Sequence, residues 1–127
     1  MDAARPNSVS KLMYDDVKGT VFEKYVAKPN SGSMHNFGAA VDIAIVDKNN
    51  EIIEMGLIPF YKSRTKIKLT YLWSKIKSKK LSKEAIKNRK LLKDVMLEAG
   101  FYPLSFEWWH FNGYKKSYIR KNYKMIN

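Results

Sequence analysis

The sequence predicts a single α+β domain with a small antiparallel sheet and flanking helices. Residues 41–46 form a nearly continuous apolar run with several β-branched side chains, which is typical of a buried strand. The motif Asp47-Lys48-Asn49-Asn50 then predicts a hairpin turn that leads into a partner strand over residues 51–55. Residues 83–99 carry apolar side chains at helical spacing after the N-cap residue Ser82, and they predict a helix.

The remaining elements are shorter. Ser8 is expected to cap a short helix that ends near residue 14. Residues 21–27 alternate weakly and favour an extended segment, whereas the basic residues 62–80 favour a loop and a short helix. A strand is predicted over residues 101–110, and a further strand or a loose tail over residues 118–126.

Composition limits the possible chemistry. The chain has 127 residues, of which 45% are hydrophobic, so it is long enough to bury one core and predicts a single domain over residues 1–127. It contains no cysteine, which excludes disulfides, thiolate metal sites and cysteine nucleophiles.

The net charge of +12 raises the possibility of an anionic partner such as nucleic acid, a membrane surface or a wall polymer. The alternative is a lysine-rich surface that only contacts solvent. The lysines are spread over many segments and are little interleaved with aromatic residues, so we favour this alternative and expect no nucleic-acid partner.

No apolar run reaches the roughly 20 residues that span a bilayer, and no hydrophobic leader follows Met1. We therefore expect a soluble chain without a transmembrane segment. A cytoplasmic location fits the chain as given, and a cell-envelope location fits if a signal peptide lies upstream.

Two short stretches contain both histidines of the chain. His35 and Asp42 lie on either side of Gly38, and small residues there allow a sharp bend that can aim both side chains at one point. A lone histidine is more often structural than a ligand. Asp42, however, lies within an apolar run, where an ionised carboxylate is costly unless it is paired or bound to a metal.

The second stretch, Glu107-Trp108-Trp109-His110, places an acid and a histidine three residues apart. In a regular strand their side chains would face opposite sides, so a bulge must bring them together if both serve one site. The alternative is an ordinary strand with an exposed glutamate and an aromatic core pair, and the spacing alone does not separate the two.

A catalytic zinc takes three protein ligands, and His35, Asp42 and His110 supply a suitable set. Glu107 is then the candidate base for the attacking water, and Arg5 the candidate cation for the developing oxyanion. A role for Arg5 as an ordinary surface residue is equally consistent with the sequence.

At these residues the chain resembles the zinc D-alanyl-D-alanine dipeptidases of the VanX type. The resemblance rests on three motifs, with further matches at residues 54–56 and 88–101. The motifs are Asp2-x-x-Arg5-Pro6, Ser33-x-His35-x-x-Gly38-x-Ala40-x-Asp42 and Glu107-Trp108-Trp109-His110.

The resemblance implies the zinc fold shared by D-Ala-D-Ala peptidases and hedgehog-type domains, with one Zn²⁺ per chain. It implies His35, Asp42 and His110 as zinc ligands, Glu107 as catalytic base and Arg5 as the transition-state arginine. It also implies that Ser33 lines the substrate site. The implied substrate is D-Ala-D-Ala or a related small peptide from peptidoglycan, so the implied biology is cell-wall degradation or biogenesis.

The chain departs from the family in two places. It begins almost at the arginine motif, so we expect it to lack an N-terminal segment and to have apolar surface available for self-association. The acid that the family places after its Met-Gly to bind the substrate ammonium is not found near Tyr61. These departures motivate a second hypothesis, a truncated or degenerate fold that binds metal without turnover. A third, a nucleic-acid-binding domain, leaves both histidines unexplained.

Overall fold

The computed structural model describes residues 2–20, 23, 26–56 and 81–127. Within them lie three α-helices, one 3-10 helix and a three-stranded antiparallel sheet, which confirms the predicted α+β class. The chain forms two compact units, Met1–Ile43 with Met96–Asn127, and Ala44–Val95. The single zinc-peptidase domain over residues 1–127 stays a prediction.

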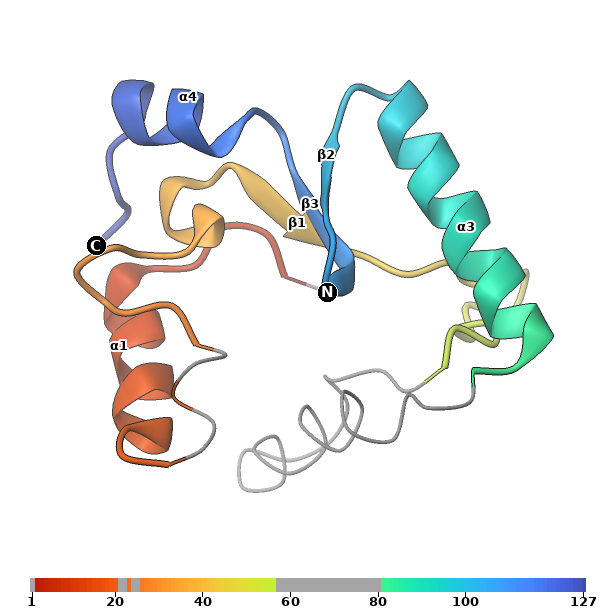
Figure 1. Ribbon diagram of the computed structural model, residues 1–127, viewed down its shortest axis with the longest axis horizontal. Coiled ribbons are helices and arrows are strands. Elements are labelled where there is room, and N and C mark those ends of the chain that lie inside the picture. The colour runs from red at the N-terminus through yellow and green to blue at the C-terminus, as the bar shows by residue number, and fades with distance from the viewer. Residues whose placement is uncertain (1, 21–22, 24–25, 57–80) are drawn as a thin grey trace. The chain divides into compact units, whose positions relative to one another are not determined.

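The sheet belongs to the first unit. Its strands are β1 (Ala40–Asp42), β2 (Tyr102–Leu104) and β3 (Glu107–Asn112), in the order β1-β3-β2 (Figure 1). Pro103 lies on the edge strand β2, where a residue without an N–H is tolerated. The single strand predicted over residues 101–110 is thus corrected to a β-hairpin.

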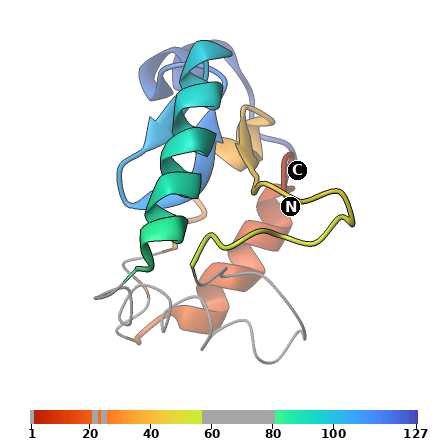
Figure 2. The same cartoon turned by 90° about the vertical axis from the view of Figure 1, so that its right-hand side faces the viewer.

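The predicted hairpin of residues 41–46 and 51–55 is present only next to its turn. Val46 and Ile52 form an isolated antiparallel bridge, and the Asp47 and Ile53 N–H groups donate to the Glu51 and Ile45 carbonyls, whereas β1 pairs with β3. The turn between them is as expected: the Asp47 carboxylate accepts from the Asn49 and Glu51 N–H groups, and Asn50 has a positive φ of 62°. This loop is yellow in Figure 2. The local hairpin is therefore short, and the start of the predicted strand pairs with β3.

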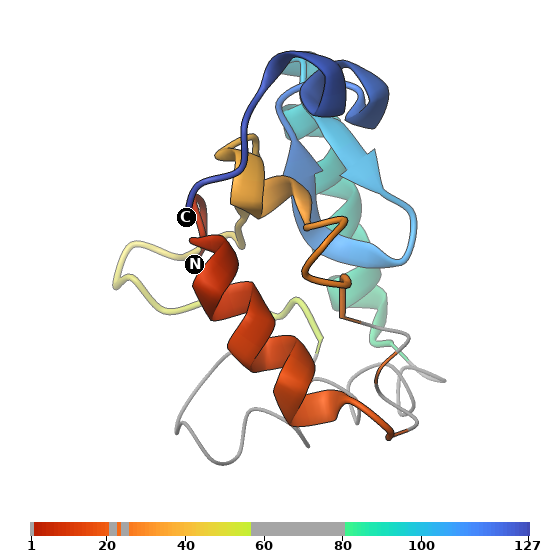
Figure 3. The ribbon, with the colours of Figure 1, turned by 90° about the vertical axis from the view of Figure 1, so that its left-hand side faces the viewer.

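Helix α1 (Asn7–Val17) begins directly after Pro6, which occupies the N-cap without a side-chain hydrogen bond. The expected cap at Ser8 is wrong, because the Pro6 carbonyl already accepts from the Val9 and Ser10 N–H groups. The Asn7 N–H donates to the Ile126 carbonyl (2.7 Å), so the C-terminal segment returns beside the start of α1 (Figure 3).

The 3-10 helix η2 (Met34–Phe37) is followed by Gly38 in the left-handed region (φ 62°), which turns the chain into β1. The predicted bend at this glycine is therefore present. Asn36 of η2 is fully buried, and its amide joins three segments. It donates to the Arg5 carbonyl (2.9 Å) and the Ser10 hydroxyl (2.8 Å), and it accepts from the Ser33 N–H (2.7 Å).

The Asn36→Ala substitution should lower the free energy of unfolding by about 2–4 kcal/mol, because it leaves several buried polar groups without their partner. Urea unfolding in the presence of chelator measures this without a metal contribution. Asn122→Ala is the control, since Asn122 is exposed and its amide donates to the Tyr118 carbonyl of its own helix. Equal stability of the two variants would contradict the structural role of Asn36.

Helix α4 (Lys116–Asn122) replaces the strand or loose tail that the sequence predicts over residues 118–126. Its Ile119 is fully buried in a core cluster with Met34, Ala39 and Ala40. Burial of this one side chain outweighs the β-propensity of the neighbouring tyrosines, because propensity is weak against tertiary packing.

Helix α3 (Lys83–Glu98) matches the predicted helix closely, and the Ser82 hydroxyl accepts from the Ala85 N–H (3.0 Å) as the predicted N-cap. In the second unit, its Asn88 amide donates to the Glu54 carbonyl and its Arg89 guanidinium to the Met55 carbonyl. These bonds hold the Glu54–Gly56 segment against the helix.

Part of the sequence prediction lies outside the described residues. This holds for the loop and helix expected over residues 62–80 and for most of the extended segment expected over residues 21–27.

Candidate metal centre

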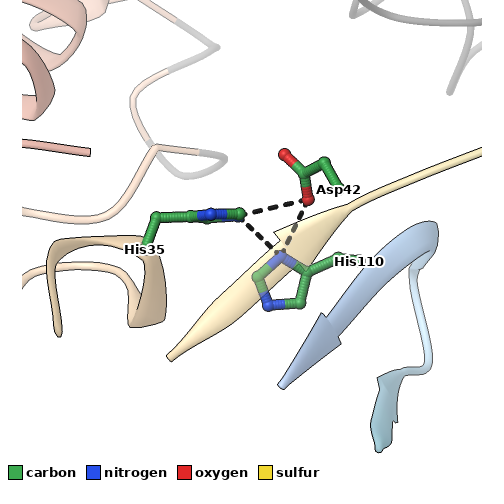
Figure 4. Close-up of side chains that lie close together, drawn as sticks. All are labelled: His35, Asp42 and His110. Carbon is green, nitrogen blue, oxygen red and sulfur yellow. Dashed lines mark hydrogen bonds and ion pairs between the residues drawn. The ribbon is translucent and has the colours of Figure 1, made fainter. Parts of the chain in front are cut away.

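Three buried side chains meet within the first unit. His35 comes from η2, Asp42 ends β1, and His110 lies opposite Asp42 in the antiparallel register of β1 and β3. His35 Nε2, Asp42 Oδ1 and His110 Nδ1 lie 3.1 Å from one another in every pair (Figure 4). The fold thus brings together donor atoms of residues that are far apart in the sequence: Asp42 follows His35 by 7 positions, and His110 follows Asp42 by 68 positions.

The other nitrogen of each histidine faces a carbonyl acceptor. His35 Nδ1 lies 2.7 Å from the Ala3 carbonyl oxygen, and His110 Nε2 lies 2.9 Å from Asn112 Oδ1. A carbonyl oxygen only accepts, so each of these nitrogens carries the proton. In the neutral rings, the two nitrogens that face Asp42 therefore carry lone pairs. Since these lone pairs repel the carboxylate, a cation, either a metal ion or a proton, is needed between them.

The donor set fits zinc. Tetrahedral bonds of about 2.0–2.1 Å place neighbouring ligand atoms about 3.3 Å apart, close to the observed spacing. Two imidazole nitrogens and one carboxylate oxygen are typical ligands of catalytic zinc, which keeps a further position for water or substrate. The three residues can therefore hold a metal ion.

Without metal, the site favours charged side chains. Burial opposes ionisation of Asp42, but hydrogen bonds from His110 and His35 prevail and lower the pKa of its carboxyl to about 2. Burial likewise opposes protonation of His110, but its hydrogen bonds to Asp42 and Asn112 prevail and raise its pKa. A protonated His110 would donate from Nδ1 to Asp42 Oδ1, into the space that suits a metal.

These shifts predict how the stability of the metal-free protein depends on pH. The contribution of Asp42 is present above its unfolded pKa of about 3.9 and is lost as the pH falls towards 2. The contribution of His110 is complete below about pH 6.5 and is lost as the pH rises through its raised pKa. Urea unfolding in chelator should therefore show a stability plateau between about pH 4 and 6.5. The same plateau in Asp42→Asn would contradict it.

Glu107 reaches the same place through an irregular pairing of β2 and β3. Pro103 lies opposite Phe111, so a regular register would place Leu104 opposite His110, but Leu104 lies opposite Glu107. This shift supplies the bulge that the sequence required. Glu107 Oε2 then lies 3.8 Å from His110 Nδ1, farther than the three donor atoms lie from one another.

Arg5 is held beside the three donors. Its N–H donates to the His35 carbonyl (3.0 Å), and its Nη2 lies 4.0 Å from Asp42 Oδ2. The Asp2 carboxylate accepts hydrogen bonds from Arg5 Nε (2.8 Å) and from Arg5 Nη2. The backbone of Asp2 also pairs with Asp42, which ties the N-terminal segment to β1. Arg5 is therefore a largely buried cation and not an ordinary surface residue.

Ser33 precedes η2. Its N–H donates to Asn36 Oδ1, and its carbonyl accepts from the Asn36 N–H (3.1 Å). Its hydroxyl is buried and has no hydrogen-bond partner among the described residues. A buried hydroxyl without a partner is a group that a bound substrate can satisfy.

Three further groups support the site without having been expected from the sequence: the Ala3 carbonyl, the Asp2 carboxylate and the Asn112 amide. Asn112 had a detectable signal, since it lies two residues after His110, the last residue of the predicted strand, and would face the same side if that strand continued. The contacts of Asp2 and Ala3 depend on how the N-terminal segment packs, which the sequence does not show.

The chain matches a known protein family over nearly its whole length. The family model for D-ala-D-ala dipeptidase (Peptidase_M15) matches residues 3–127. The chain therefore belongs to this family of metallopeptidases, which confirms the resemblance seen in its motifs.

A curated relative in this family is D-alanyl-D-alanine dipeptidase from Escherichia coli (strain K12). It is 29% identical to this chain over 110 residues, which cover 87% of this chain and 51% of the relative. The chain thus spans about half the length of the curated relative it matches.

Two expectations concern features away from the donor triangle. Tyr61, near which the ammonium-binding acid was sought, lies outside the described residues. No helix in the described part of the chain combines the length and the apolar character that a membrane span requires.

Proposed function

We propose that this chain is a zinc-dependent dipeptidase that hydrolyses D-Ala-D-Ala or a related peptide derived from peptidoglycan. The observation that carries the proposal is the 3.1 Å triangle of His35 Nε2, Asp42 Oδ1 and His110 Nδ1. Membership of the dipeptidase family and the similarity to the Escherichia coli enzyme support the choice of reaction and substrate.

His35, Asp42 and His110 would hold one zinc ion per chain, with the proton positions on both rings already set by Ala3 and Asn112. When bound, zinc lowers the pKa of its water to about 7 and polarises the scissile carbonyl. The chain's own residues then bind the substrate and move its protons.

Glu107 is the proposed general base and acid. It accepts a proton from the attacking water and delivers a proton to the leaving nitrogen. The C–N bond therefore breaks to release a neutral amine and not an amide anion. Its carboxylate lies within reach of the donor triangle but farther out than the proposed ligands, as a base for the attacking water requires.

Arg5 is the proposed cation for the carbonyl oxygen as negative charge develops there. Its largely buried guanidinium has donors left beyond those that Asp2 engages, because an arginine carries five N–H groups. Ser33 is proposed to line the substrate site, since its hydroxyl is buried without a partner among the described residues.

The direct test is release of D-alanine from D-Ala-D-Ala by the purified chain. We expect release with added zinc, loss of release after chelation, and recovery when zinc is restored. L-Ala-L-Ala is the matched control for stereochemistry. Release that is unchanged by chelation would overturn the zinc-dependent mechanism.

The same assay examines the second candidate, a fold that binds metal without turnover. The coverage of only 51% of the Escherichia coli relative motivates it. Stoichiometric zinc without hydrolysis of D-Ala-D-Ala or related peptides would favour this candidate. Size-exclusion chromatography over a concentration series would test the proposed self-association.

A further inference from the structure

We propose that Asn112 is a positioning residue that selects the ring nitrogen with which His110 binds the metal. By accepting the Nε2 proton, its amide oxygen leaves the Nδ1 lone pair facing Asp42 Oδ1 and His35 Nε2. The inference rests on the proposed zinc site but not on catalytic turnover.

The fold holds the Asn112 amide oxygen in a fixed position as the acceptor for the His110 Nε2 proton. It lies two residues after His110 on β3, so both side chains face the same side of the sheet. β3 is the central strand, and the backbone of Asn112 pairs with Ala40 on one side and Tyr102 on the other. The side chain is buried, so water does not replace the amide oxygen easily.

The two histidines use opposite nitrogens, which makes this selection necessary. His35 presents Nε2 to the site. The position of its ring proton is set by the backbone carbonyl of Ala3, which no substitution removes. His110 presents Nδ1, and the position of its ring proton is set by the side chain of Asn112. If His110 carried its proton on Nδ1, that hydrogen would point at Asp42 and block coordination. One substitution therefore tests the selection.

Asn112→Ala should weaken zinc binding by about 10–100-fold, as is typical when the outer hydrogen-bond partner of a metal-bound histidine is lost. Asn112→Asp should bind zinc at least as tightly as the wild type, because a carboxylate is a stronger acceptor for the Nε2 proton. Zinc affinity is measured by competition with a chelating dye.

Asn88→Ala is the matched control. Asn88 is buried to a similar degree and donates one hydrogen bond, to the Glu54 carbonyl, but it lies in the second unit. We expect this variant to lose stability without losing zinc affinity, which separates a general effect of removing a buried asparagine from an effect on His110.

A second readout reports the proton positions directly. The chain has only two histidines, so ¹⁵N-edited spectra of the zinc-loaded protein contain two imidazole patterns. We expect the proton on Nδ1 of His35 and on Nε2 of His110 in the wild type and in Asn112→Asp.

The inference is overturned if Asn112→Ala binds zinc as tightly as the wild type, if Asn112→Asp binds as weakly as Asn112→Ala, or if zinc-loaded His110 carries its proton on Nδ1. A wild type that binds zinc but does not hydrolyse peptides contradicts the proposed function and leaves this inference intact. A wild type that binds no zinc contradicts both.

Discussion

Replacing Glu107 by glutamine should slow hydrolysis of D-Ala-D-Ala by about 10²–10⁴-fold, the usual contribution of a positioned general base and acid. Glutamine keeps the size of the side chain but does not take the proton of the attacking water. Since Glu107 is not among the three proposed ligands, zinc should remain bound. The loss should therefore appear in kcat with little change in zinc affinity.

The measurements are initial rates of D-alanine release and zinc affinity on the same preparations. Glu98→Gln is the control, because Glu98 is an exposed acid at the end of α3. A Glu107→Gln variant that keeps the wild-type rate would remove Glu107 from the mechanism. A variant that loses its zinc would instead make Glu107 a ligand.

Removing zinc should lower thermal stability as well as abolish hydrolysis. A ligand present at 100 times its Kd stabilises the native state by about 2.7 kcal/mol. For a chain of this length that corresponds to a difference of about 10 °C in Tm. The effect has a structural cause, since the metal would remove the repulsion between two facing nitrogen lone pairs and would balance the charge of a buried carboxylate.

Differential scanning calorimetry with added zinc and with chelator measures this difference. Asp42→Ala should lose most of the zinc-dependent rise in Tm, because it removes the only anionic ligand of the proposed set. Asp94→Ala is the control, since Asp94 is an exposed residue of α3 that pairs with Lys90. A rise in Tm that persists in Asp42→Ala would place the zinc elsewhere.

The fold was predictable where local signals agree with tertiary packing. Helix α3 has an N-cap at Ser82 and a positive-φ glycine at Gly100, and the structure reproduces both ends. The turn at residues 47–50 was predictable for the same reason, since asparagine tolerates a positive φ. These features depend on contacts within a few residues.

The errors lie where contacts distant in sequence decide. β1 was expected to pair with the strand after the turn, but it pairs with β3, about 70 residues away. Helix α4 was expected as a strand or a tail, but Ile119 packs in the core with Met34. Local patterns do not rank such distant partners, because the free energy of burial depends on the whole fold.

The residue types alone establish the chemical inventory of the candidate site: two histidines, a carboxylate in an apolar run, and an acid near the second histidine. They also indicate that Gly38 allows a bend, and that a bulge before His110 is needed if Glu107 and His110 serve one site, since strand periodicity alone separates these two side chains. The arrangement of the site depends instead on tertiary contacts. The pairing of Asp42 with His110 brings the donors to 3.1 Å, and the Ala3 carbonyl and Asn112 set which nitrogens face them. Residue types are local, whereas the direction of a lone pair depends on the acceptor that the fold places behind the ring.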